Sequence, residues 1–110
     1  MKAGVKDTLS SLVTALCADY KRRAEIMADR SKERRLRMEC RYLNMRIFEA
    51  AAEVAGTALA NLFIDEIGRS VGYASSEAVI LSESTYKDYK RGIRIGIAKK
   101  LHLIEPPSPR

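Results

Sequence analysis

A single histidine, two cysteines and no long apolar run are among the scarcities of this 110-residue chain. His102 has no group of cysteine, aspartate or glutamate residues around it, so the sequence predicts neither a metal site nor a cofactor. There is no phosphate-cradling glycine loop, and no nucleophile has a base beside it. Adjacent carboxylates such as Asp65 and Glu66 point in different directions on a helix, so we expect both to be solvated. These absences indicate a protein that is not an enzyme.

Apolar residues in the first 25 positions are interrupted every few residues by Asp, Lys, Ser or Thr. This pattern leaves neither a signal-peptide core nor a membrane span, so we expect a cytoplasmic protein without a membrane partner. In that compartment Cys17 and Cys40 are expected to be small core residues rather than a disulfide. With 46% hydrophobic and 31% charged residues and no low-complexity tract, the composition is typical of an ordered domain.

The formal net charge of +6 is concentrated in one stretch of the chain. Between Lys21 and Arg46 there are ten basic residues against four acidic ones, and the remaining ten basic and ten acidic residues cancel. Any long-range attraction to phosphate therefore comes mainly from this central segment.

Apolar residues recur at helical spacing along the chain, and no stretch alternates as a strand would. The first helix is predicted from Val5 to about Met27, with a break near residues 28 to 31, where Asp29 or Ser31 is suited to cap the next helix. The second predicted helix ends at Gly56 and has a heptad-like stripe of Leu36, Cys40, Leu43, Ile47, Ala50 and Val54. We expect these two helices to pack as an antiparallel hairpin over residues 5–56.

A third helix is predicted from a cap at Thr57 to a left-handed glycine at Gly72. The last helix is predicted to start at a cap formed by Ser82 or Ser84 and to run to about Leu101, before a proline-rich tail at 105–110. Its apolar face comprises Tyr86, Tyr89, Ile93, Ile97, Leu101 and Ile104. Gly92 and Gly96 lie one turn apart and predict close packing, either inside the fold or against a second copy. The expected fold is all-α, a compact bundle of four to five helices in one domain over residues 1–104.

Basic side chains adjoin the apolar face of the last helix. Lys87, Arg91 and Arg94 share one flank, and Lys90 lies at its border with the apolar face. Such cations can contact phosphates, and arginine can also bind guanine through two hydrogen bonds. A solvated basic face accounts for the same pattern equally well.

Two stretches near the C-terminus resemble known DNA-binding motifs. The first, "IDEIGRSVGYASSEAV" (residues 64–79), is similar to the helix-turn-helix of arabinose-operon-activator-type regulators, in having Gly68, Gly72, Tyr73, Ser75, Ser76 and Val79. The second, "ILSESTYKDYKRGIRIGIAKKLHLI" (residues 80–104), resembles the recognition helix and tail of small phage late-transcription regulators, which are similar to the C-terminal DNA-binding domain of sigma factors. The first resemblance starts the recognition helix near Ser75, where no cation occurs before Lys87, whereas the second starts it at Ser82 and includes the cations. We therefore favour the second.

This resemblance implies a helix-turn-helix-like part over residues 57–104 and a phage-type transcriptional regulator that binds double-stranded DNA. It implies that the recognition helix opens with residues 82–86. The predicted contacts in the groove are Ser84, Thr85, Lys87, Lys90, Arg91 and Arg94, and the predicted additional phosphate contacts are Arg34, Arg35 and Arg37.

Two alternatives remain open. One is a non-enzymatic oligomeric structural or adaptor protein, a homodimer or higher oligomer, whose subunit contacts use the stripe of the second helix and the glycine flank of the last. The other is RNA binding, which would favour unpaired bases stacked on Tyr86 or Tyr89.

Overall fold

The computed structural model describes residues 2–78 and 80–104, and the predicted tail at 105–110 and Val79 lie outside the described residues. The helices are α1 (Lys2–Ala18), α2 (Tyr20–Ala28), α3 (Arg34–Ala55), α4 (Thr57–Gly68), the short 3-10 helix η1 (Tyr73–Ser75) and α5 (Glu83–Lys100). None of the described residues belongs to a strand, so the predicted all-α class is confirmed.

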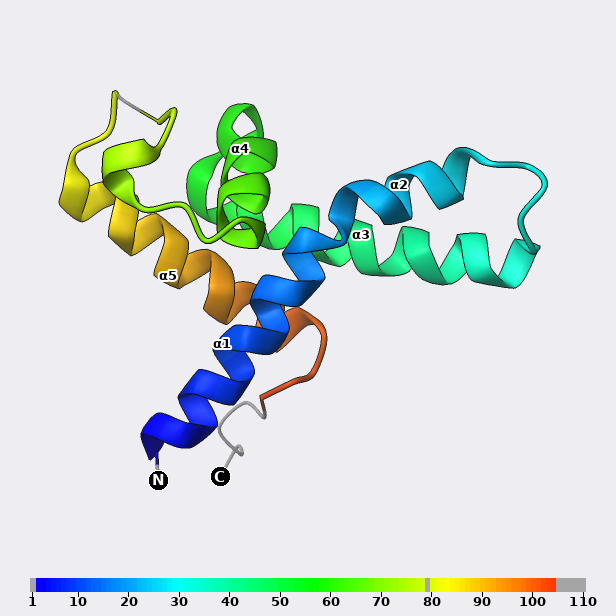
Figure 1. Cartoon of the computed structure of the whole chain (residues 1–110), viewed down its shortest axis with the longest axis horizontal. Coiled ribbons are helices and arrows are strands. Elements are labelled where there is room, and N and C mark those ends of the chain that lie inside the picture. Colours follow the sequence, from blue (N-terminus) through cyan, green and yellow to red (C-terminus); the bar gives the residue numbers. More distant parts are fainter. Residues whose placement is uncertain (1, 79, 105–110) are drawn as a thin grey trace.

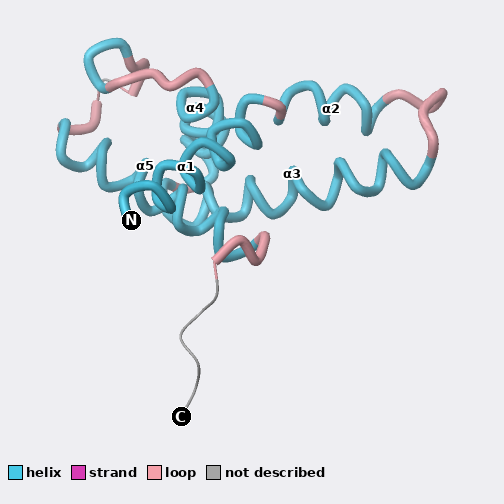
Figure 2. Tube along the Cα trace, turned by 60° about the horizontal axis from the view of Figure 1, so that its bottom comes forward, coloured by secondary structure: helices cyan, strands magenta, loops and turns pink. Residues whose placement is uncertain are grey.

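The predicted first helix is in fact two helices, because the chain bends at Asp19 between α1 and α2. After the bend, α2 lies antiparallel beside the first half of α3, while α1 turns away to pack against α4 and α5 (Figures 1 and 2). The hairpin predicted for residues 5–56 is therefore formed by α2 and α3 without α1. We call residues 20–46 the arm, because they extend from the rest of the bundle (Figure 1).

The arm makes the molecule longer than a spherical domain of its size. The radius of gyration is 14.8 Å, against about 13 Å expected for a compact chain of this length. At the tip of the arm, Asp29 accepts hydrogen bonds from the backbone N–H and the hydroxyl of Ser31, at 2.9 and 2.7 Å. The sequence predicted that Asp29 or Ser31 caps α3. This prediction is wrong, because these bonds close a turn and the N-cap residue of α3 is Glu33.

The hydrophobic core is centred on α4, which packs against α1 and α3 and, through Phe63 against Tyr86, against α5. Its largest apolar side chains are Phe63, Ile64 and Ile67 of α4 with Ile47, Tyr86, Ile93 and Ile97 from α3 and α5. Cys17 and Cys40 are both buried free thiols, as predicted. Burial raises the pKa of the Cys17 thiol to about 11, against the opposing influence of Arg94 and Arg23.

Glycines allow the helices to approach closely. A Cβ at Gly68 would lie 2.7 Å from the backbone nitrogen of Ala18, so the crossing of α1 and α4 requires glycine there. In α5, Gly92 and Gly96 face Val54 and Ala50 of α3. The glycine flank of the last helix therefore packs inside the fold rather than against a second copy.

The helix ends differ in detail from those predicted. Thr57 is the first residue of α4, and Gly56, with φ 86°, precedes it. α4 ends with Ser70 in the left-handed region (φ 57°), while Gly72 is extended. The N–H of Val71 donates to the Glu66 carbonyl at 2.9 Å and that of Ser70 to the Ile67 carbonyl at 3.1 Å, which is a Schellman motif.

Among the caps predicted for the last helix, Ser82 is confirmed. Its side chain accepts a hydrogen bond from the backbone N–H of Thr85 at 3.2 Å. At the other end, His102 takes a left-handed φ of 60°, and the N–H of Leu103 donates to the Ala98 carbonyl at 2.8 Å. The lone histidine thus belongs to the turn that ends α5.

Candidate nucleic-acid interface

The arm holds the whole excess of positive charge, since ten of the basic residues and only four of the acidic ones lie between Lys21 and Arg46. Five of these cations are exposed and form no ion pair with any residue in the described ranges: Lys21, Arg30, Lys32, Arg34 and Arg41. They come from α2, from the loop at the tip and from the first two turns of α3. The arm therefore presents solvated positive charge on an extended two-helix surface.

The remaining arginines of the arm already have partners or are partly buried. Arg22 pairs with Asp19 at 2.6 Å, and Arg46 pairs with Glu49 at 3.1 Å. Arg35 lies 3.3 Å from Glu39, but its side chain is 85% exposed. Water therefore screens this ion pair, and its interaction energy is small. Arg37 is partly buried, and its Nε has no hydrogen-bond partner among the described residues. Of the three predicted phosphate contacts in the arm, Arg34 and Arg35 are the accessible ones.

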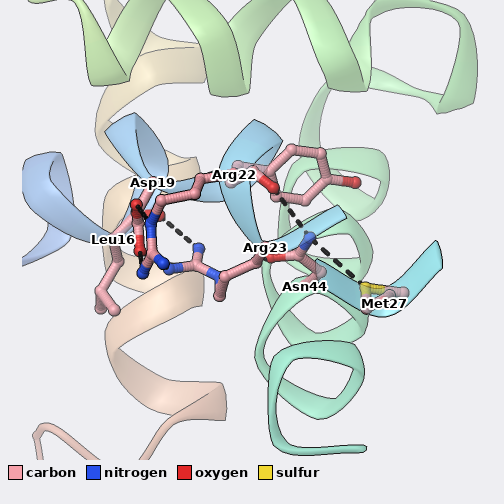
Figure 3. Close-up of polar contacts among 7 residues, drawn as sticks. Leu16, Asp19, Arg22, Arg23, Met27 and Asn44 are labelled. Carbon is pink, nitrogen blue, oxygen red and sulfur yellow. Dashed lines mark hydrogen bonds and ion pairs between the residues drawn. The ribbon is translucent and has the colours of Figure 1, made fainter. Parts of the chain in front are cut away.

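Arg23 belongs to the fold rather than to the charged surface, and the sequence did not reveal this. Only 3% of the residue is exposed. Its Nε donates to the side-chain carbonyl of Asn44 at 2.7 Å, its Nη2 donates to the carbonyl of Leu16, and its Nη1 lies 3.5 Å from Asp19 (Figure 3). Burial lowers the pKa of Arg23, and Asp19 opposes that effect. The guanidinium joins the bend between α1 and α2 to the middle of α3.

On α5, Lys87 and Arg91 are exposed, as predicted for groove contacts. Each has an acidic partner on the same helix, since Lys87 lies 2.9 Å from Glu83 and Arg91 lies 2.6 Å from Asp88. Both pairs are largely solvated, and exposed pairs of this kind are weak. The two cations remain available to a phosphate, but the charges of Glu83 and Asp88 neutralise them, so this part of α5 has no net positive charge.

Lys90 and Arg94 are partly buried and donate hydrogen bonds to other parts of the fold. The Lys90 ammonium donates to the carbonyl of Val71 at 2.7 Å and lies 5.3 Å from the centroid of the Tyr86 ring. Burial, followed by repulsion from Arg94, lowers the pKa of Lys90. The Arg94 Nη1 donates to the Thr14 hydroxyl at 2.9 Å and to the Ser10 hydroxyl at 3.1 Å, which ties α5 to α1. Half of the predicted cations of this helix therefore stabilise the fold.

The polar start of α5 is accessible. Ser84 is exposed, and Thr85 is partly buried with its hydroxyl 3.0 Å from that of Ser82. The aromatic rings nearby are not accessible for stacking. Tyr86 is 1% exposed, and the partly buried Tyr89 packs edge-on against Phe63, with 5.8 Å between the ring centroids. Unpaired bases therefore cannot stack on Tyr86 in this structure.

The two predicted groups of basic residues do not form one surface. α3 and α5 contact each other near Ala50 and Gly96, and their basic ends extend from that contact to opposite sides of the molecule (Figure 1). Along α3, Arg34 lies about 24 Å from Ala50. Residues 69–82 form a 14-residue connection between α4 and α5, longer than the short turn typical of a helix-turn-helix. Of the two recognition helices that the sequence offered, only the later one, α5, is formed.

Glu66 overturns the expectation that the adjacent carboxylates Asp65 and Glu66 are both solvated. Asp65 is exposed and pairs with Arg69, whereas Glu66 is 0% exposed. Its carboxylate accepts hydrogen bonds from the Ser76 hydroxyl at 2.6 Å, the Glu77 backbone N–H at 2.9 Å and the Tyr86 hydroxyl at 2.7 Å. Burial alone would raise the pKa of Glu66, but these hydrogen bonds outweigh it and lower the pKa below its ordinary value. Glu66 thus attaches the connection to α4 and α5.

The described residues contain no group of three or more His, Cys, Asp or Glu side chains that could hold a metal ion. No single helix among these residues is long and apolar enough to cross a membrane. Taken together, α3 and α4 reach that length and apolarity, but the pair is bent by 115°. An open groove of about 900 Å³ lies on the arm, lined by Glu33, Arg34, Arg35, Met38, Glu39, Tyr42 and Leu43.

Comparison of the chain with protein-family models, with curated proteins and with solved structures finds no match.

Proposed function

We propose that this protein is a non-catalytic binder of double-stranded nucleic acid, with duplex DNA as the expected ligand. The observation that carries the proposal is the set of five exposed cations on the arm that form no ion pair with a described residue. A DNA duplex carries about one negative charge per 1.7 Å of its axis, and binding to it gains free energy from counterion release at each neutralised phosphate. An arm with cations on both helices and at its tip is suited to lie along or across such a backbone.

The last helix has a secondary part in this proposal. Lys87 and Arg91 are exposed, and Ser84 stands in the first turn of α5, where helix N–H groups and hydroxyls favour a phosphate. A role in transcription, in a regulator of the phage type, is supported only by the resemblance of residues 80–104. The arm is therefore expected to supply affinity, and α5 to modulate it.

The test is fluorescence anisotropy with a mixed-sequence DNA duplex, with single-stranded DNA and with RNA, from about 50 to about 300 mM salt. If all five arm cations contact phosphates, log Kd rises with log salt with a slope of up to about 4.5. The triple variant Arg30→Ala, Lys32→Ala, Arg34→Ala is expected to lower that slope by about 2.7. The comparison variant Lys87→Ala with Arg91→Ala is expected to lower it less, because both cations already have acidic partners.

Each result has a defined meaning. An unchanged salt slope in the folded arm variant would remove the arm from the interface, and a larger loss in the α5 variant would return the interface to the last helix. If none of the three ligands binds at low salt, the protein is not a nucleic-acid binder.

In that case the structure favours a second function, that of an adaptor or oligomeric protein. The supporting observation is a row of exposed apolar side chains on α3, namely Met38, Tyr42 and Met45. The predicted stripe of the second helix does not serve this purpose, because Cys40, Ile47 and Ala50 are buried within the chain.

A further inference from the structure

One side of α3 carries exposed apolar residues where a solvated helix would be polar. Met38, Tyr42 and Met45 are 58%, 49% and 42% exposed. Their spacing of four and three residues places them in one row along the helix. We call this row, with Arg34 before it and Glu49 after it, the outer face of α3. Half of the large exposed apolar side chains in the described ranges come from positions 36 to 45 of this helix.

The outer face carries basic residues at one end and acidic residues at the other. Its first turn carries Arg34 and Arg35, and its far end carries Glu49 and Glu53. Arg34 has no ion pair with a described residue. Glu49 contacts Arg46 at 3.1 Å and Lys100 at 3.9 Å, and Glu53 contacts Lys100 at 2.9 Å. The Glu49 side chain is still 38% exposed, so a cation of another molecule can reach its carboxylate. With two carboxylates facing two cations, this end has no excess of positive charge for a phosphate backbone.

We propose that the outer face of α3 is an interface with a second copy of this chain, in which the two α3 helices pack antiparallel about a two-fold axis. The spacing of the residues favours this orientation. If Met38 of one copy lies opposite Met45 of the other, then Arg34, four residues before Met38, lies opposite Glu49, four residues after Met45. The symmetric contact repeats this pair at its other end. Tyr42 lies next to the axis, where it contacts the partner's helix.

A parallel arrangement would place Arg34 against the second Arg34 and Glu49 against the second Glu49, so like charges would meet at both ends. The row from residue 34 to residue 49 is about 22 Å long. An interface of that length is at the small end for specific complexes, so we expect a dissociation constant in the range of about 1 to 100 μM. The proposed dimer shares Arg34 with the proposed phosphate surface. Because association is measured without nucleic acid, and nucleic-acid binding is tested by its salt dependence, the failure of one proposal is distinguishable from the failure of the other.

The experiment is sedimentation equilibrium of the whole chain at protein concentrations from about 1 to about 300 μM. The expected result is an apparent mass that rises from that of the monomer toward that of the dimer. Met38→Glu combined with Met45→Glu is expected to weaken association at least about tenfold. Both side chains are exposed, so helicity measured by circular dichroism should be unchanged. Ile95→Glu on α5 is the matched control, because Ile95 is 44% exposed and lies outside the row.

The orientation of the two helices is tested by disulfide trapping. The chain's own cysteines, Cys17 and Cys40, are buried, so they do not compete with introduced surface cysteines. A chain with Met38→Cys is mixed with a chain with Met45→Cys and oxidised. The antiparallel register predicts that the mixed disulfide dominates over both homodimeric disulfides. A monomer throughout the concentration range, association that is unaffected by the double glutamate variant, or a dominant homodimeric disulfide would each overturn the proposal.

Discussion

Removing the buried carboxylate of Glu66 should destabilise the protein more than any other change of a single charged residue in α4. Glu66 is inaccessible and is held by three donors, from Ser76, Glu77 and Tyr86. Replacement by alanine leaves the Glu77 N–H and two hydroxyls without their acceptor. It also leaves a cavity next to the Tyr86 hydroxyl, which lies 2.7 Å from the buried carboxylate.

The magnitude follows from the hydrogen bonds. A buried donor left without an acceptor costs about 1–3 kcal/mol. The Tyr86 hydroxyl lies 3.4 Å from the Val71 carbonyl and can turn to it, so about two donors are lost outright. We therefore expect Glu66→Ala to lower the free energy of unfolding by about 2–6 kcal/mol, out of the 5–15 kcal/mol or so typical of a domain. Glu66→Gln keeps the volume and one acceptor, so its cost is expected to be about 1–2 kcal/mol.

The assay is urea unfolding followed by circular dichroism, with Asp65→Ala as the control. Asp65 precedes Glu66 on the same helix but is exposed, so this variant should unfold close to the wild-type midpoint. Equal destabilisation by Asp65→Ala and Glu66→Ala would refute the reasoning, because the effect would then be one of helix charge rather than of buried hydrogen bonds.

Glu66 also predicts a pH dependence. Its pKa is lower in the folded protein than in the unfolded chain, so its contribution to stability is fully present above the unfolded value, about 4.3, and is lost as pH falls through the folded value. The gap in stability between wild type and Glu66→Gln should therefore narrow below about pH 4.3. A gap that is constant from neutral to acid pH would contradict this assignment.

The remaining predictions concern packing and the helix ends. Gly68→Ala should lower the melting temperature strongly, because the new Cβ would meet α1 backbone at 2.7 Å, whereas Gly92→Ala, 3.4 Å from the Val54 side chain, should be tolerated; equal melting temperatures would contradict this. Ser70→Gly should stabilise the protein by about 0.5–1 kcal/mol in urea unfolding, since Ser70 has a φ of 57°. Arg23→Met should destabilise it by about 2–4 kcal/mol in urea unfolding, because Asn44 and Leu16 lose a buried donor, and a loss below about 1 kcal/mol would count against the network. The buried Cys17 thiol, with a pKa of about 11, should react with a thiol reagent at pH 8 only on unfolding, and rapid labelling of the native protein would refute its burial.

Local sequence patterns predicted most of the helices and the inward face of the last one. The six residues of that predicted apolar face are buried or partly buried, as their spacing indicated, and Ser82 caps the helix. The break near residues 28 to 31 and the end at Gly56 were also correct. These features depend on residues within a few positions of one another, so a single chain segment contains the information. The bend at Asp19 was not predicted, because it depends on the distant partner Asn44 of Arg23.

The candidate site was less predictable because charge alone does not say where a side chain points. Lys90 and Arg94 follow the same pattern as Lys87 and Arg91, yet they bind Val71, Ser10 and Thr14. Their partners lie on the connection and on α1, which the sequence could not place beside α5. Periodicity likewise gave no reason to expect Glu66 to be buried, since its donors are 10 to 20 residues away.

By itself, the sequence determined that this protein is helical, which apolar residues form the inward face of the last helix, and that its excess positive charge lies between Lys21 and Arg46. It did so because helical period and net charge are properties of the local chain. Only the tertiary structure decided that the charged segment forms an arm and that two cations of α5 serve the fold. It also decided that Glu66 is buried and that the apolar row on α3 is left exposed. Each of these depends on which distant elements come together, and the burial of a polar side chain is favourable only where those elements supply its hydrogen bonds.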